Sequence, residues 1–205
     1  CIRDSADPDN YYQFVDAEMA QGRDPSATTA ELRGFLFDEE ATVWSGLGTF
    51  ASFLFTHNAQ IGIMCLGLGV ALGIPVFFIL FTNGQVLGAM AALYHQNGLS
   101  VEFWGWILPH GVTELGALLL CGTAGLVLAR AVILPGPYTR TAALARQGRR
   151  AGIIVLGSVA MLATAALIEG FFRQLVHSTT IRYAVAGLTL ILWAIYFTRV
   201  GRRKG

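Results

Sequence analysis

The sequence is short of charged residues. Aspartate, glutamate, lysine and arginine together make up 13% of its 205 residues, whereas 54% are hydrophobic. Soluble domains carry charge on roughly a quarter of their residues. The composition therefore excludes a soluble globular protein and indicates a chain that lies mostly in a membrane.

Several catalytic and binding signatures are also missing. The three cysteines, Cys1, Cys65 and Cys121, have no paired spacing, and the last two lie in apolar runs where they are expected to pack as small hydrophobic side chains. No aspartate follows Asp38, so the apolar part of the chain lacks a Ser/His/Asp nucleophile set. The glycine-rich piece 67–73 lies inside an apolar run, where small residues serve close helix packing rather than dinucleotide binding. We expect no cofactor and no nucleic-acid partner.

The charges that are present are unevenly distributed. Ten of the thirteen acidic residues precede position 41, and eleven of the fourteen basic residues lie at or beyond Arg130. This asymmetry divides the chain into a polar acidic head (1–41), a transmembrane helical domain (42–200) and a basic tail (201–205). The head is expected to lie in water.

The order of apolar stretches and turn signals predicts an all-α fold. Segment 43–57 spans only ~22 Å as a helix, which is shorter than the ~30 Å hydrocarbon core. Asn83 and Gly84 form a turn signal, and Pro109 suits the first turn of a helix. The stretch 96–108, with its aromatic residues, is expected to be a loop at the membrane interface. We predict a polytopic transmembrane helical bundle with about five to six membrane helices, some short or interfacial. The expected helices are 10–21 and 28–37 in the head, then 43–57, 59–82, 85–95, 109–134, 151–176 and 180–198.

The basic residues predict the orientation of the bundle. Arginines gather in the 137–150 loop and in the C-terminal tail, and cytoplasmic loops are enriched in lysine and arginine. Both segments are therefore expected inside, which leaves 96–108 and 177–180 outside. The side of the head depends on segment 43–57: if the segment lies flat in the interface the head is outside, and if it crosses the head is cytoplasmic. Its short length favours the flat arrangement.

A few polar residues interrupt the apolar helices. His110 and Glu114 are four residues apart and share one helix face, as do Glu169 and Arg173. An ionisable group at the membrane midplane costs roughly 2.5–3.5 kcal/mol on insertion scales, so its presence needs a reason. The predicted topology brings these residues to one depth, in the outer third of the membrane. His57 and Asn58 reach the same depth from a third segment.

These residues have structural and functional interpretations. Glu169 and Arg173 form either an interfacial ion pair or part of a site. His110 and Glu114 either join helices by hydrogen bonds or bind a ligand, a proton or a metal, with His57 and Glu169 as further metal-ligand candidates. No HExxH or other recognised ligand spacing occurs, so the sequence alone does not assign a metal.

Four short stretches together resemble the stage II sporulation protein M family. They are Phe55-Thr56-His57-Asn58, Asn83-Gly84 followed by Gly88, the stretch 108–115 with its Pro-His-Gly and Glu114, and the stretch 166–171 with its Glu-Gly-Phe. The likeness covers residues from about 43 to 200, and the head carries no motif of the family. By this likeness, the family's motif positions in this sequence are His57, Asn58, Asn83, Gly84, His110, Glu114 and Glu169.

The resemblance implies a multi-pass protein of the bacterial inner (plasma) membrane. The member that names the family is thought to act as a membrane scaffold for peptidoglycan-degrading enzymes during engulfment. It also implies a longer chain, with a cytoplasmic part and one more membrane helix upstream of Cys1, and this supports a head that lies outside. The family occurs in bacteria that never sporulate, so the sporulation role does not transfer automatically.

Two functional hypotheses follow. The first is a non-enzymatic scaffold that recruits envelope-remodelling partners, contacts membrane lipids and forms homo-oligomers through small-residue faces such as 67–73 and 84–88. Asn83, Gly84, Gly88 and Gly111 then serve turns and helix packing. The second is a transporter, a lipid-handling protein or an intramembrane metal-dependent hydrolase that uses His110 and Glu114. Interrupted helices, which commonly line binding cavities, favour the second hypothesis.

Overall fold

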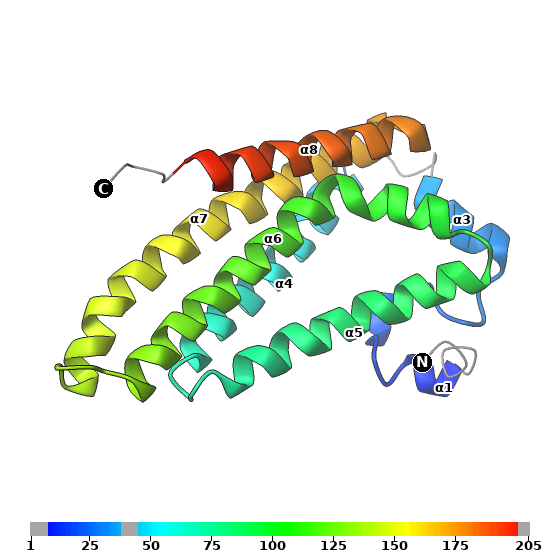
Figure 1. Cartoon of the computed structure of the whole chain (residues 1–205). Coiled ribbons are helices and arrows are strands. Elements are labelled where there is room, and N and C mark those ends of the chain that lie inside the picture. Colours follow the sequence, from blue (N-terminus) through cyan, green and yellow to red (C-terminus); the bar gives the residue numbers. More distant parts are fainter. Residues whose placement is uncertain (1–7, 38–44, 201–205) are drawn as a thin grey trace.

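The computed structural model describes residues 8–37 and 45–200, and within these ranges every regular element is an α-helix. Three short helices form the head, and five long ones form the bundle (Figure 1). The head contains α1 (Pro8–Tyr11), α2 (Ala17–Ala20) and α3 (Thr29–Phe37). The bundle contains α4 (Ser45–Leu68), α5 (Ile74–Gln96), α6 (Ser100–Ile133), α7 (Arg140–Leu175) and α8 (Thr179–Arg199).

The bundle has the lengths and surfaces of a membrane protein. Within the described residues, four helices are long and apolar enough to cross a membrane, namely α5, α6, α7 up to Gly170, and α8. Large hydrophobic side chains such as Phe78 on α5, Leu156 on α7 and Leu190 on α8 are exposed. In water such surfaces would drive aggregation, whereas lipid tails accept them. The predicted all-α membrane bundle is confirmed.

Helix α6 is the centre of the bundle. In its most apolar stretch 44% of the residues are buried, against 11–28% for the other three candidate spans, and it contacts α4, α5, α7 and α8. Its backbone approaches the end of α4 very closely: a Cβ atom on Gly125 would collide with the carbonyl oxygen of Cys65, and one on Gly69 with the backbone of Gly125. Two glycines at one crossing therefore allow the two backbones to touch.

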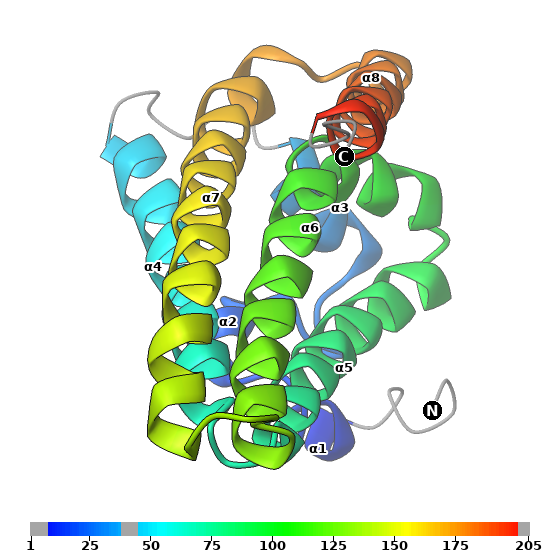
Figure 2. The same ribbon diagram turned by 60° about the vertical axis from the view of Figure 1, so that its left-hand side comes forward.

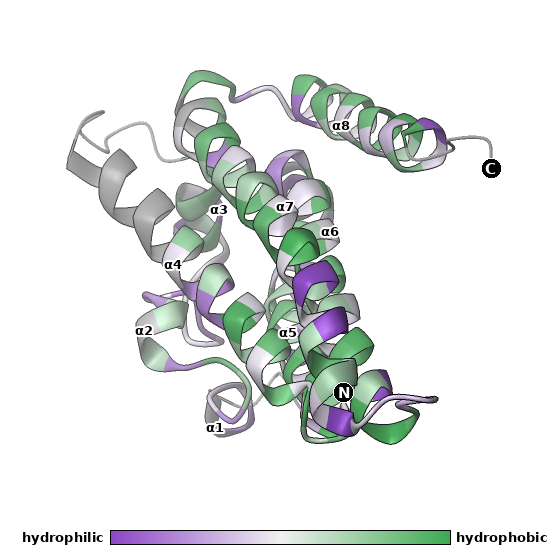
Figure 3. Ribbon diagram, turned by 90° about the vertical axis from the view of Figure 1, so that its left-hand side faces the viewer, coloured by the Kyte–Doolittle hydropathy of each residue, from purple (hydrophilic) through white to green (hydrophobic). Residues whose placement is uncertain are grey.

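The two ends of the bundle differ (Figures 1 and 2). The end on the left of Figure 1 carries the 69–73 turn, the 134–139 loop and the C-terminal end of α8, and we name it the basic end. The opposite end, named the head end, carries α3 and the α5–α6 and α7–α8 loops, while α1 and α2 lie beside α4 and α5 (Figure 2). Because α4 runs the length of the bundle, the head lies opposite the arginine-rich start of α7. In Figure 3 that start is hydrophilic, whereas the helices around it are mainly apolar.

The head is packed onto the bundle through a shared core. Tyr11, Val15 and Leu32 of the head are buried in one cluster with Tyr94 of α5 and Phe103 of α6. The rings of Tyr94 and Phe103 are stacked, with centroids 4.8 Å apart. The core therefore begins in the head and continues between the ends of α5 and α6.

A capping box begins α3. The backbone N–H of Thr28 donates to Glu31 Oε2 at 2.7 Å, and the backbone N–H of Glu31 donates back to Thr28 Oγ1 at 3.3 Å. The bond from the Thr28 backbone holds the pKa of the Glu31 carboxyl below its ordinary value. The helix predicted at 28–37 is confirmed as α3. The helix predicted at 10–21 is wrong, because α1 ends at Tyr11 and a separate α2 begins after Asp16.

The predicted breaks in the first half of the bundle were misplaced. The turn expected at Asn83 and Gly84 is wrong, because both residues lie inside α5 and the Asn83 side-chain amide donates to the Ile79 carbonyl of the same helix at 2.9 Å. The chain instead turns at 69–73, where Leu72 and Gly73 have positive φ angles of 62° and 76°. Residues 45–57 are therefore the first part of α4 rather than a flat interfacial helix, 74–82 belong to α5, and 85–95 is the second half of α5. Because the break expected at Asn83 is absent, α4 and α5 each run once between the two ends, and the start of α4 lies at the end opposite the arginines.

Two predicted loops are also helical. Helix α6 begins at Ser100, so 96–108 is not an interfacial loop, and Phe103 and Trp106 are buried in the shared core. Pro109 lies inside α6 rather than at its first turn. Helix α7 begins at Arg140, where Thr139 Oγ1 caps it by accepting from the Ala142 N–H at 3.3 Å, so most of the 137–150 loop is helix. The predicted ends near 134 and 198 are confirmed.

Candidate functional site

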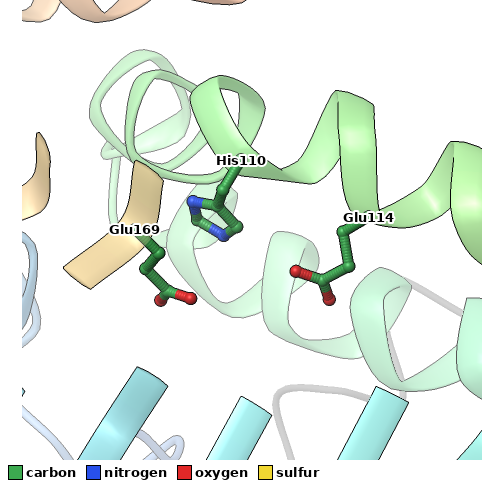
Figure 4. A group of neighbouring side chains, drawn as sticks. All are labelled: His110, Glu114 and Glu169. Carbon is green, nitrogen blue, oxygen red and sulfur yellow. The ribbon is translucent and has the colours of Figure 1, made fainter. Parts of the chain in front are cut away.

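Three ionisable side chains from two helices meet inside the bundle near its head end. His110 and Glu114 come from α6 and Glu169 comes from α7, and in Figure 4 the three side chains point toward one another. One nitrogen of His110 and one carboxylate oxygen of each glutamate all lie within 4.8 Å of one another. Asn58 of α4 joins them, because its Nδ2 donates to Glu114 Oε1 at 2.5 Å. We name these four residues the polar cluster.

A bend in α6 positions the first member of the cluster. Pro109 has no backbone N–H to donate within the helix, and sharp helix bends are commonly found at proline. Figure 1 shows α6 bent near the head end, and His110 follows Pro109 directly. Glu114 lies four residues further along the helix, on the same face. The indole of Trp106 packs edge-on against the His110 ring, with centroids 6.0 Å apart.

Three members of the polar cluster are buried in an otherwise apolar bundle, and the fourth, Glu114, is partly buried. The exposed fractions of Glu169, Asn58 and His110 are 3%, 5% and 6%. Polar groups placed so deeply in a membrane protein face other protein groups or a cavity rather than lipid. One turn from the cluster, the indole Nε1 of Trp193 on α8 donates to Thr113 Oγ1 at 2.9 Å and joins α8 to α6.

A cavity of about 340 Å³ adjoins the cluster. All four cluster residues line it, and so does Arg23 of the head. Most of its remaining wall is apolar, with Leu87 of α5 and Leu118 of α6 as examples. Two further wall residues, Leu115 and Leu119, are exposed on the outside of the bundle, so the cavity opens sideways between α5 and α6.

Arg182 is a second buried cation near the cluster, and the sequence analysis did not identify it. Its exposed fraction is 2%, and it lines a small adjoining cavity together with His110 and Glu169. Its guanidinium donates to the Val176 carbonyl at 2.8 Å and to the Leu36 carbonyl at 3.2 and 3.3 Å. A single arginine at the start of an apolar helix is typical of a solvated interface position, so the sequence offered no sign of its burial.

The other predicted site residues have different positions. His57 is half-buried and lines the large cavity, as do Asn83, Gly84 and Gly111. Gly88 is exposed, and a Cβ atom there would meet no atom within 4 Å. Arg173 belongs to α7, but its side chain lies outside the part of the chain that the structure describes, and so does the predicted Glu169–Arg173 pair.

The donor set of the cluster suits cation binding or hydrogen bonding between helices. One imidazole and two carboxylates offer nitrogen and oxygen ligands, while the Asn58 amide fixes the orientation of one carboxylate. The two described cysteines, Cys65 and Cys121, belong to a separate hydrophobic cluster with Ile61 and Val76. The chemistry of the site therefore rests on His110, Glu114 and Glu169.

Comparison with known proteins agrees with the fold. A family model described as stage II sporulation protein M matches residues 14–173, from within the head to near the end of α7. The match begins earlier than the resemblance at 43–200, so the family region includes α2 and α3. No curated protein and no solved structure matches the chain. The chain belongs to the stage II sporulation protein M family.

Proposed function

We propose that the chain is a multi-pass protein of a bacterial inner membrane that organises protein partners of the cell envelope, with peptidoglycan-remodelling enzymes as the partner class. Family membership supports the membrane scaffold role. The observation that carries the proposal is the head, because it forms a helical platform fixed to one end of the bundle. A scaffold needs such a platform, since a partner held by a rigid surface is also oriented by it.

Several contacts fix the platform in place. Besides the shared core, Thr29 Oγ1 donates to Asn97 Oδ1 of the α5–α6 loop at 2.8 Å. In the first part of the head, between α1 and α2, Tyr11 and Val15 are buried in the shared core, while Tyr12 and Phe14 are exposed. Exposed aromatic side chains on a rigid surface are typical of protein interfaces. We assign partner docking to the surface around Tyr12 and Phe14.

The distribution of arginines supports an outward-facing platform. Arg140, Arg146, Arg149 and Arg150 lie at the start of α7, at the basic end. Segments rich in arginine and lysine stay in the cytoplasm, so the opposite, head end faces the envelope space where peptidoglycan is remodelled.

A membrane-impermeant thiol crosslinker tests both the outward orientation of the head and the docking of partners around Tyr12 and Phe14. In a chain with Cys1→Ser, we expect Gln13→Cys at the exposed head to react in intact spheroplasts and to capture envelope enzymes, while Ala142→Cys at the exposed start of α7 stays unreacted. Adding Phe14→Asp is expected to lower capture by about tenfold or more, since a buried aromatic contact contributes ~1.4 kcal/mol or more to binding. Reaction at Ala142→Cys alone would reverse the orientation, and capture unchanged by Phe14→Asp would remove the docking surface.

Helix α5 also supports the proposal of self-association. Gly88 is exposed and a Cβ atom there would meet nothing within 4 Å, so α5 is open to close approach by a second helix at this position, whereas Gly84, one turn away, lines the cavity. Gly73, by contrast, already packs against Leu126 and Ala129 of the same chain. We expect Gly88→Cys to form a disulfide between copies in native membranes, with Gly157→Cys in α7 as an exposed control whose Cβ atom also meets nothing within 4 Å. Equal yields at both positions would contradict a specific contact.

The polar cluster favours a second candidate function, the handling of an amphipathic, lipid-like molecule. The cavity has a suitable lining, because the cluster and Arg23 provide polar groups and the exposed side chains of Leu115 and Leu119 provide apolar ones. This function includes the lipid-handling and intramembrane hydrolase alternatives. A metal ion bound by His110, Glu114 and Glu169 would supply the chemistry of the hydrolase alternative.

A further inference from the structure

We propose that His110, Glu114 and Glu169 bind one divalent transition-metal ion, with Zn²⁺ and Mn²⁺ as the best-fitting species. The proposal is independent of the scaffold role, and it gives the second candidate function its chemistry. It rests on the geometry of the three donors, on their burial beside a cavity, and on the partner of one of the carboxylates.

The donors are close enough to share an ion. Bonds from Zn²⁺ to histidine nitrogen and carboxylate oxygen are about 2.0–2.2 Å long, so two atoms on one ion are at most about 4.4 Å apart. The three donor atoms already lie within 4.8 Å of one another. A small rotation about the broad terminal torsion of either glutamate brings the set within bonding range.

The surroundings resemble those of a metal site. Metal-bound carboxylates are normally held by hydrogen bonds from neighbouring groups, and Asn58, itself 5% exposed, supplies such a bond to Glu114. The Asn58 amide comes from α4, so three helices converge on the position where an ion would lie. A buried carboxylate, Glu169, next to a partly buried one, Glu114, is disfavoured unless cations balance the two charges. Arg182 adjoins Glu169, and a divalent ion between the two glutamates supplies the remaining positive charge.

The donor types select the class of ion. Imidazole suits Zn²⁺, Fe²⁺ and Cu²⁺, whereas carboxylate oxygens suit Mn²⁺ and Mg²⁺, so a mixed set of one histidine and two glutamates favours Zn²⁺ or Mn²⁺. Copper(I) prefers thiolates, and the described cysteines Cys65 and Cys121 lie in a separate cluster.

Three protein ligands leave coordination positions open. Catalytic zinc sites use three protein ligands and keep the fourth position for water or substrate, whereas structural sites use four. Here the open side is the cavity, into which His110, Glu114 and Glu169 all face. The site therefore takes a water molecule or an oxygen of the headgroup of an amphipathic molecule as its further ligand.

Metal binding by the purified, untagged full chain tests the proposal. After treatment with EDTA and dialysis against Zn²⁺ or Mn²⁺, we expect about one tightly bound ion per chain by elemental analysis, and a Co²⁺-loaded sample should show the visible absorption of a low-symmetry site. His110→Gln, Glu114→Gln and Glu169→Gln should each weaken binding by about 100-fold or more, and Asn58→Ala by about 10-fold.

Matched controls separate this site from adventitious binding. His177→Gln changes an exposed imidazole and Glu102→Gln changes a carboxylate outside the cluster, so both should retain the ion. Circular dichroism and gel filtration identify any variant that fails to fold, and the wild-type stoichiometry is decisive by itself. If the wild-type chain retains no ion, or if the controls lose it equally, the proposal is wrong and the cluster joins helices only by hydrogen bonds. Crosslinking at the head would be unaffected by that outcome.

Discussion

Replacing Gly125 with alanine is expected to force α4 and α6 apart and to lower the free energy of unfolding of the bundle by about 3 kcal/mol or more. This value is the upper end of the usual cost of adding a methyl group to a well-packed core. The added methyl group would collide with the Cys65 carbonyl oxygen, which belongs to the backbone and has no rotamer with which to move aside. Because α6 is the central helix, its displacement also loosens the packing that holds the polar cluster.

Two substitutions of the same kind provide the comparison. A Cβ atom on Gly116, also in α6, would approach only the flexible end of Met161 at 3.4 Å, and one on Gly67 in α4 would meet nothing within 4 Å. Both alanine variants should be neutral or stabilised by up to ~1 kcal/mol, because alanine favours helix over glycine. Unfolding by SDS in mixed micelles, followed by circular dichroism, measures all three variants. Equal stability of Gly125→Ala and Gly116→Ala would show that the two backbones are not in contact.

Replacing Arg182 with methionine is expected to loosen the head from the bundle at a cost of about 3 kcal/mol. The side chain keeps most of its volume, but the Val176 and Leu36 carbonyls lose their buried donor. Leu36 lies in the last turn of α3, where free carbonyls and the helix dipole favour a cation. The guanidinium also lies over the Phe37 ring at 5.0 Å.

Hydrogen exchange measures this effect locally. In Arg182→Met we expect the α3 amides to exchange much faster, while those in the middle of α6 change little. Arg33→Ala is the control, because this exposed arginine makes a 3.8 Å contact with Glu102 and lies 5.8 Å from the centroid of the Phe37 ring, and surface ion pairs of this kind contribute about 0.2–1 kcal/mol. Arg182→Lys, which keeps the charge but not the planar fork, should fall between the two. Unchanged protection of α3 in Arg182→Met would show that the shared core alone holds the head.

Much of the fold is predictable from the sequence because a membrane imposes strong constraints. The scarcity of charge and the long apolar runs indicated a helical bundle, and Pro135, Gly136 and Pro137 fixed the end of α6. The breaks in the first half were misplaced for a physical reason. Asn83-Gly84 is a turn signal in water, but inside a membrane the helical hydrogen bonds are retained, because unpaired backbone groups are costly there.

The sequence was sufficient to predict which ionisable residues form the site, but not which groups they contact. Ionisable residues are so rare in the apolar part that His110, Glu114 and Glu169 stand out in the sequence. The contacts of Arg182 could not be predicted, because its acceptor at Leu36 is 146 positions away and is a backbone carbonyl, which has no sequence signature. The packing of the head on the bundle could not be predicted either, because it depends on hydrophobic contacts between residues far apart in the sequence.

The sideways opening of the cavity determines how a small molecule would reach the polar cluster. Exposed Leu115 and Leu119 form the rim between α5 and α6, so the entrance faces acyl chains instead of bulk solvent. Occupancy would follow the partition coefficient of the compound and its mole fraction in the bilayer, while its dissolved concentration would matter only indirectly. A hydrophilic inhibitor of the cluster would therefore need an acyl tail to act.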